Sequence, residues 1–440
     1  MSLARSDNIS HRRVLNIAIP IAVSNATVPL LGAVDTGVVG QMGAAAPIGA
    51  VGIGAIILTT LYWFFGFLRL GISGLTAQAR GESDPYEVTA LLVRGLLIAF
   101  VAGILLAFLQ KPLLTVSFLV APASDVVESL AWDYAAIRIL SAPAAISMFA
   151  ITGWLIAHEK TRSVLLIQVV TNGINIVLDL VFVLVLDLGV RGVAVATVTA
   201  EISGLVLALY LCRGAFQHGY WCHWSVVFDR ERLTRLAVLN SDIVIRNILI
   251  EAIFVSLLFL AADLGDVTLA ANQILLQFLL LTAHALDGFA FAAEALVGLA
   301  VGARRRSELR RSVVLTSVWS GILALVMSFG LVIFGSLGIN IMTTAADVRA
   351  ESLAYLPWIV AAPLVGAPAW ILDGIFVGAT RGRDMRNSML VSAALYGLCV
   401  IILVPMVGNH GLWAGILLSF AARAVTLGRK YRAVEDDANN

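Results

Sequence analysis

The chain has 440 residues, of which 60% are hydrophobic and only 13% are charged. A water-soluble domain carries roughly 25% charged residues, because a surface that faces water needs polar cover. This composition excludes an ordinary soluble enzyme, and a net charge of +1 favours neither nucleic acid nor an acidic substrate as a partner.

A helix that crosses a membrane needs about 20 mostly apolar residues. Twelve stretches meet this requirement and predict an all-α integral membrane protein. Several stretches exceed the minimum, so we expect tilted or extended helices. The predicted spans are 14–40, 48–72, 88–110, 128–157, 163–186, 193–212, 237–262, 268–301, 312–336, 353–378, 388–407 and 411–428.

The connectors between these spans differ strongly in positive charge. With the N-terminus inside, the inner connectors and the two ends hold about twenty-one Lys and Arg residues, whereas the outer connectors hold only Lys111, Arg191 and Arg349. Because positively charged connectors stay in the cytoplasm, this bias predicts cytoplasmic N- and C-termini. We expect a multi-pass protein of a bacterial inner membrane.

An internal repeat has an offset near 220 residues, half of the chain. Ala77–Arg80 resembles Val301–Arg304, and Leu188–Gly192 resembles Val407–Gly411. Six spans in each half make the halves parallel repeats about an axis along the membrane normal. The predicted organisation is an N-terminal six-helix bundle (1–212), a cytoplasmic linker (213–236) and a C-terminal six-helix bundle (237–440), with pseudo-two-fold symmetry.

Ionisable side chains inside a span cost roughly 2.5–3.5 kcal/mol each. One interpretation is that each acid pairs with a buried arginine, and Arg69, Arg138 and Arg246 also lie inside spans. This is most attractive for Glu294, which the repeat offset places near the position equivalent to Arg69. The other is a titrating or cation-binding group that faces an aqueous cavity. The intramembrane acids are Asp35, Asp179, Glu201, Glu251, Asp287, Glu294 and Asp373.

The fifth span carries three polar residues at helical spacing. Asn172, Asn175 and Asp179 lie three and four residues apart, which places them on one face. An amide can donate to a carboxylate or ligate a cation through its oxygen, so this face is a candidate ion site. The alternative is that the amides join neighbouring helices. In the first span, Pro20 and Pro29 predict a kinked helix before Asp35.

Other chemistry finds little support in the sequence. Cys212, Cys222 and Cys399 give no disulfide framework, and the cysteines and histidines of the linker have no standard zinc spacing. There is no Walker motif, nucleophile elbow or H-E-x-x-H motif. We therefore expect no enzyme, no bound metal and no cofactor beyond a coupling ion.

Five segments carry a resemblance to a known family. Leu15–Pro20, Val28–Thr36 and Gly74–Ala79 resemble the multidrug and toxic compound extrusion (MATE) family. Leu286–Ala295 and Leu372–Ser388 are similar to its DinF branch in particular. The resemblance implies two six-helix bundles in a V shape and the efflux of organic compounds against an inward proton or sodium gradient.

The resemblance also implies roles for single residues. The residues that correspond to the family's proton or cation site in the N-terminal bundle are Asp35, Asn175, Asp179 and Thr197, with Asn172 beside them. A second cation site, used by sodium-coupled relatives, falls on Glu251 and Asp373. Proton coupling is preferred here, because the N-terminal set is complete and the DinF branch is usually interpreted that way.

The sequence thus predicts a monomeric antiporter in the lipid bilayer that exports small organic compounds, cationic or amphipathic, in exchange for H⁺, with Na⁺ as the other option. A lipid-linked precursor flippase is the alternative, and it would need a basic central cavity. A membrane-embedded enzyme or a structural subunit is the third possibility. No nucleic acid partner is expected.

Overall fold

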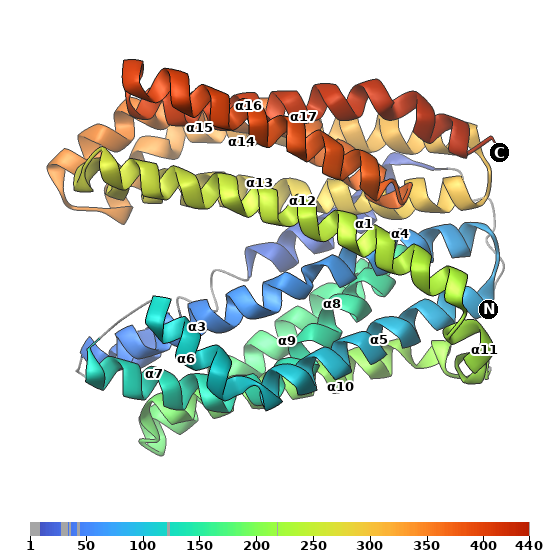
Figure 1. The fold of residues 1–440 in the computed structure, drawn as a ribbon, viewed down its shortest axis with the longest axis horizontal. Coiled ribbons are helices and arrows are strands. Elements are labelled where there is room, and N and C mark those ends of the chain that lie inside the picture. Colours follow the sequence, from blue (N-terminus) through green and yellow to red (C-terminus); the bar gives the residue numbers. More distant parts are fainter. Residues whose placement is uncertain are drawn as a thin grey trace. The chain divides into compact units, whose positions relative to one another are not determined.

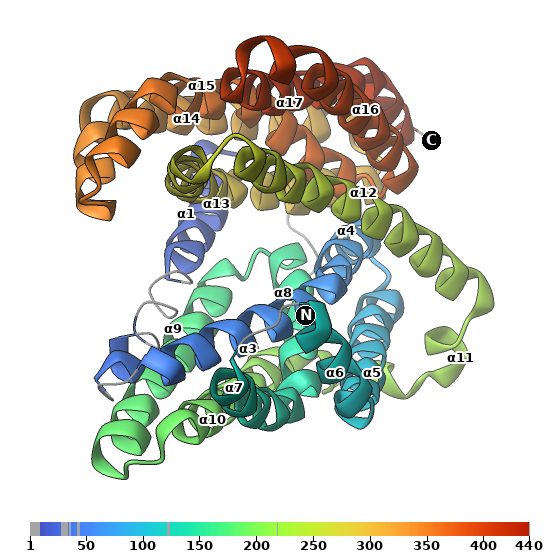
Figure 2. The same ribbon diagram turned by 60° about the vertical axis from the view of Figure 1, so that its left-hand side comes forward.

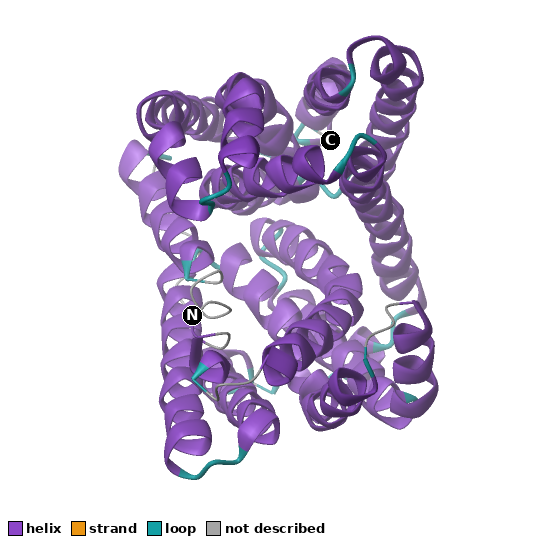
Figure 3. Cartoon of the chain, turned by 90° about the vertical axis from the view of Figure 1, so that its left-hand side faces the viewer, coloured by secondary structure: helices purple, strands orange, loops and turns teal. Residues whose placement is uncertain are grey.

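The computed structural model describes residues 9–27, 34, 37–41, 45–120, 124–217 and 219–439. Within these ranges the chain is helical, with short turns between the helices and no strand (Figure 3). The predicted all-α fold is therefore confirmed. The helices belong to two compact units.

The N-terminal unit comprises the described parts of Val23–Thr76 and Asp84–Arg230. Two of its helices, α1 and α4, contribute residues to both units. The linker after α10 is folded into short helical turns. The helices of this part of the chain are α1 (His11–Ala26), α3 (Ala45–Trp63), η1 (Phe64–Gly66), α4 (Phe67–Gly81), α5 (Pro85–Phe108), α6 (Gln110–Val120), α7 (Asp125–Arg138), η2 (Ile139–Ser141), α8 (Ala142–Ala157), α9 (Thr161–Asp179), η3 (Leu180–Val185), α10 (Gly189–Cys212), η4 (Arg213–Ala215), η5 (Tyr220–Cys222) and α11 (Trp224–Val227) (Figure 1).

The C-terminal unit comprises Glu231–Asn440 together with residues 9–22 and Ala77–Ser83, as far as these are described. Its helices are longer than those of the N-terminal unit, and α16 and α17 lie side by side (Figures 1 and 2). They are α12 (Arg230–Asp263), α13 (Asp266–Gly302), α14 (Arg306–Met342), α15 (Ala346–Gly378), α16 (Gly382–Val407) and α17 (Asn409–Asp437).

Eleven helical stretches among the described residues are long and apolar enough to cross a membrane, and they match eleven of the twelve predicted spans. The remaining span, 14–40, begins with α1, which is described over 16 residues. Much of its second half, including Asp35 and Pro29, lies outside the described residues.

Two predicted connectors are helical. Lys111–Leu114 lies in the connector predicted between the spans 88–110 and 128–157, but it belongs to α6, because Pro112 is tolerated in a first turn and the following residues are apolar. Leu114 and Phe118, one turn apart, are both buried and anchor α6 to the core. The linker was predicted to reach residue 236, but α12 already begins at Arg230.

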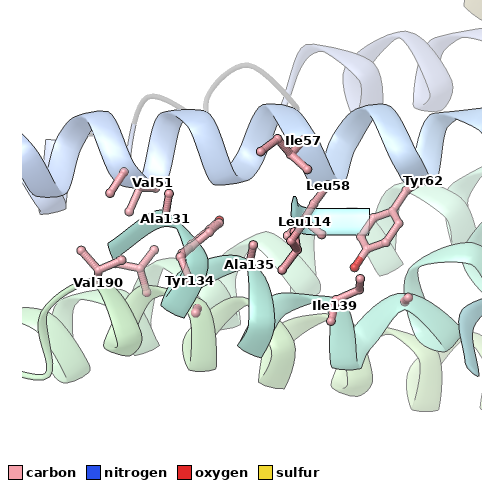
Figure 4. Packing of buried hydrophobic residues seen from close by; sticks show 14 of the residues in the cluster. Val51, Ile57, Leu58, Tyr62, Leu114, Ala131, Tyr134, Ala135, Ile139 and Val190 are labelled. Atoms are coloured by element: carbon pink, nitrogen blue, oxygen red, sulfur yellow. The ribbon is translucent and has the colours of Figure 1, made fainter. Parts of the chain in front are cut away.

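The core of the N-terminal unit forms where α3 packs against α7 (Figure 4). Val51 and Leu58 of α3 face Ala131 and Ala135 of α7, and small alanines allow the two helices to approach closely. The hydroxyl of Tyr62 donates a hydrogen bond to the carbonyl oxygen of Arg138, 3.1 Å away. This core holds α7 in place beside α10, on which the candidate site partly depends.

Glycines shape the core of the C-terminal unit. Gly374 and Gly378 of α15 form a G-x-x-x-G pattern, the spacing at which two membrane helices approach most closely. A Cβ atom on Gly374 would collide with the carbonyl oxygen of Ala290, and one on Gly378 would collide with that of Glu294. The backbones of α13 and α15 therefore touch at this crossing.

Candidate functional site

The polar face of α9 is buried in the N-terminal unit. Asp179 is fully buried, and Asn172, Asn175 and Thr197 are each less than a tenth exposed. The Nδ2 atom of Asn175 donates to Oγ1 of Thr197 over 3.1 Å, and this hydroxyl donates to the carbonyl oxygen of Val193 over 2.9 Å. The structure thus brings together the predicted residues of α9 and α10.

A second set of hydrogen bonds extends this polar face towards α1. Gln168 donates from Nε2 to Oδ1 of Asn172 over 3.0 Å. Asn172 in turn donates from Nδ2 to Oγ1 of Thr27 over 3.3 Å. Asn172 therefore ties α9 to the end of α1, which is the helix that leads to Asp35. Asp35 itself lies outside the described residues.

The oxygen of the Asn175 amide is the notable atom of this cluster. It is buried and has no hydrogen-bond partner among the described residues. Asp179 lies one turn further along the same face of α9. A buried amide oxygen costs free energy unless a donor or a cation engages it. The site therefore has capacity for a proton-bearing group or a small cation.

The helix changes its geometry at the predicted acid. The α-helical part of α9 ends at Asp179, and Leu180–Val185 form a π-helical turn. The N–H of Leu186 donates to the carbonyl oxygen of Val181, five residues earlier. Such turns are rare and often mark functional sites. The residue pattern did not predict this feature.

The other predicted acid of the N-terminal unit forms an ion pair. Arg138 of α7 donates from Nη1 to Oε1 of Glu201 of α10 over 2.8 Å. The side chains are 10% and 19% exposed, so this pair is largely shielded from solvent. Its geometry matches the structural interpretation of an intramembrane acid, in which the acid neutralises a neighbouring arginine.

The C-terminal unit holds a buried cluster of charged side chains around Asp373. Arg246 donates from Nη2 to Oδ2 of Asp373 over 2.5 Å. Nη1 of Arg423 lies 3.5 Å from the same oxygen, and its side chain is only 5% exposed. Two arginines thus surround one carboxylate, and a cation at Asp373 would have to compete with them.

Glu251 is not part of that cluster. It is exposed, and it lies five residues after Arg246 on α12, about 140° further around the helix. Of the remaining predicted acids, Asp287 is half-buried on α13 and Glu294 is buried at the crossing with α15. The structure therefore does not gather the predicted second site, Glu251 and Asp373, around one point of the described residues.

The sequence pattern did not predict a role for two buried arginines. Arg423 belongs to the cluster at Asp373, and Arg94 of α5 holds the linker. Arg94 donates to the carbonyl oxygens of Val226 and Val227 over 2.5 and 2.7 Å, and it pairs with Glu87 over 2.7 Å. An arginine within an apolar window was the available signal for both residues.

Comparison with known proteins identifies relatives along most of the chain. A model of the MatE family matches residues 20–181 and 243–406. The chain is 38% identical over 430 residues to DNA damage-inducible protein F of Escherichia coli, a match that covers 96% of this chain and 92% of that protein. It is 25% identical over 457 residues to a probable multidrug resistance protein NorM of Rhizobium meliloti, covering 98% and 95% of the two chains.

Solved structures share the fold. A crystal structure of MATE in the bent conformation and a MOP superfamily transporter from Pyrococcus furiosus each align with a TM-score of 0.87. Both are 17% identical to this chain, and both alignments cover 98% of this chain and 97% of the other. This likeness confirms the twelve-helix fold that the hydropathy pattern predicted. The chain belongs to the MatE family.

Proposed function

We propose that the protein is a secondary active multidrug efflux antiporter that exports cationic or amphipathic organic compounds in exchange for protons. The names of the relatives support efflux: one is a probable multidrug resistance protein, and another, from Oryctolagus cuniculus, is multidrug and toxin extrusion protein 1. The polar cluster of α9 supports the proton as the coupling ion.

The observation that carries the proposal is the buried amide oxygen of Asn175 one turn from Asp179. When Asp179 is protonated, its hydroxyl can donate to this oxygen. When Asp179 is ionised, carboxylate and amide oxygen both present lone pairs, and a donor or cation must come between them. The cluster therefore has two charge states with different hydrogen bonding, which a proton-driven switch requires.

These two states suggest how transport is coupled. Protonation of Asp35 or Asp179 from the outside removes negative charge and weakens the hold on a cationic substrate, which leaves. Loss of the proton to the inside restores the charge and the affinity. The coupling is the difference in substrate affinity between the two states. The π-helical turn after Asp179 is the segment in which we expect the backbone to respond.

The C-terminal cluster is the less suitable ion site. Asp373 is already engaged by Arg246, so a sodium ion there would leave a buried guanidinium without its counter-charge. Glu251, its proposed partner, faces another side of α12. Sodium coupling through Glu251 and Asp373 is for these reasons the second choice.

The flippase alternative is not favoured. It requires a basic cavity for a pyrophosphate group, whereas the predicted substrate site of the N-terminal unit holds Asp179 and amides. The relatives described by a transport role carry names of drug or toxin extrusion. We further propose a monomer in the bacterial inner membrane with both termini in the cytoplasm, as the distribution of Lys and Arg predicts.

The test is ethidium efflux from proteoliposomes under an imposed proton gradient and, separately, a sodium gradient. Wild type is compared with Asp179→Asn and Asp35→Asn. The matched control is Asp187→Asn. Asp187 is an exposed acid eight residues after Asp179, and asparagine also adopts the left-handed backbone conformation found at this position. We expect proton-driven efflux in wild type and in the control, and its loss in both site variants.

A different pattern would redirect the proposal. Sodium-driven efflux that survives both site substitutions and is lost in Asp373→Asn would place the ion site in the C-terminal unit. Efflux that all variants retain under a proton gradient would contradict a role for the α9 cluster. If ethidium moves under neither gradient, further organic cations and then lipid-linked compounds are tested as substrates.

A further inference from the structure

An apolar groove runs along the C-terminal unit between α14, α15 and α17. Its volume is about 810 Å³, and most of the side chains that line it are apolar. On α14 the lining residues form two rows along the helix, one that includes Ser317 and one that includes Val318. The lining residues Ile322 and Leu325 are 44% and 61% exposed. Such a surface needs an apolar cover, which in a membrane is a lipid acyl chain.

At one end of the groove, an arginine lies on the same face of α14 as each of these two rows. Arg310 lies seven residues before the lining residue Ser317, and Arg311 lies seven residues before the lining residue Val318. Seven residues make almost two helical turns, so each arginine stands on the same face as its lining residue. On α17, Arg432 follows the lining residue Gly428 by one turn and is exposed.

The same end of the groove holds an ordered ion-pair cluster. Glu435 of α17 accepts hydrogen bonds from Arg306 over 2.7 Å and from Arg310 over 2.8 Å. Two guanidinium groups for one carboxylate leave one positive charge there. Arg311 and Arg432 are two further arginines on the groove faces. The half-buried Tyr431, one turn before Glu435, lines the groove at the boundary between its apolar and charged parts.

We propose that this groove binds an anionic phospholipid, with an acyl chain along α14 and α15 and the phosphate beside Arg311 and Arg432. Basic residues at the mouth of an apolar crevice between membrane helices are the chemistry that recognises such headgroups. Charge complementarity selects an anionic lipid over a zwitterionic one. In the orientation proposed above, the lipid belongs to the inner leaflet, where anionic lipids meet cytoplasmic arginines.

The test uses phosphatidylglycerol that carries a photoreactive acyl chain, in phosphatidylcholine vesicles containing the full-length protein. Labelled peptides are identified by mass spectrometry, and the same experiment is run with photoreactive phosphatidylcholine. We expect groove peptides of α14 and α15 to be labelled preferentially by the anionic probe. Each positive charge near a membrane surface is worth about a five-fold change in affinity. Arg311→Gln with Arg432→Gln should therefore lower this preference about ten-fold or more.

Two matched controls separate a site from general attraction. Gly321 lines the groove and has open space where a Cβ would stand, so Gly321→Leu places an apolar side chain in the groove. Gly330→Leu makes the same change on the same helix, also into open space, about 180° away. For charge, Arg12→Gln with Arg383→Gln removes two exposed arginines that do not line the groove.

The outcomes decide the proposal. It predicts that labelling of the groove falls in Gly321→Leu and in the Arg311, Arg432 double variant, and that both controls label as wild type does. Equal labelling by the two probes would overturn it. So would an equal loss in the control double variant, or full labelling in Gly321→Leu, since the arginines would then attract lipid without a groove site.

Discussion

Two ion pairs join the same two helices, α7 and α10, and they differ chiefly in burial. Arg138 and Glu201 are 10% and 19% exposed, whereas Arg191 and Asp133 are 69% and 37% exposed. Their closest contacts are similar, 2.8 and 3.0 Å. The pairs therefore form an internal comparison of what burial does to a salt bridge inside one bundle.

We predict that Glu201→Gln lowers the free energy of unfolding by about 3 kcal/mol, because it leaves the buried guanidinium of Arg138 without a counter-charge. Asp133→Asn should cost less than about 1 kcal/mol, because the exposed Arg191 is solvated in either case. The double variant Arg138→Met, Glu201→Gln should recover most of the loss, since no buried charge remains.

The assay is equilibrium unfolding of the purified protein in mixed detergent micelles, followed by tryptophan fluorescence, with the coupling energy taken from the double-mutant cycle. A coupling energy for Arg138 and Glu201 no larger than that of the exposed pair would refute the reasoning. So would a double variant that is less stable than Glu201→Gln.

Three further predictions concern other parts of the chain. Asn175→Leu replaces the amide by an apolar side chain of similar size and removes one hydrogen-bonding group, worth about 1.4 kcal/mol, beside Asp179. Proton-driven efflux from proteoliposomes should fall at least ten-fold in this variant. Arg94→Met should free the linker, seen as faster proteolysis near Val227, while the exposed Arg213→Met should not. Gly378→Leu should destabilise the α13–α15 crossing and lower the unfolding temperature, whereas Gly397→Leu, into open space, should leave it unchanged.

The architecture could be predicted well from the sequence, because hydropathy and helix length are local properties. Each membrane span could be counted, since lipid imposes a minimum length of apolar chain. The error at Lys111–Leu114 has the same origin. α6, at 11 residues, is too short to span, so hydropathy gave no reason to separate it from a connector, and only the burial of Leu114 distinguishes it.

The site was predictable where its residues share one helix. Asn172, Asn175 and Asp179 stand on one face by their spacing, and the structure buries all three. The pairing of Asp373 with Arg246 and Arg423 joins three helices, and no spacing within one segment can reveal such a contact. The π-helical turn after Asp179 is a feature of the backbone, which a pattern of residue types does not record.

Substrate-induced proton release tests the central claim most directly. The purified protein in weakly buffered detergent solution is mixed with an organic cation, and a pH indicator follows the protons that leave the α9 cluster. The account predicts release in wild type and in Asp187→Asn, and no release in Asp179→Asn combined with Asp35→Asn. Cation binding without proton release in wild type, or unchanged release in that double variant, would contradict it.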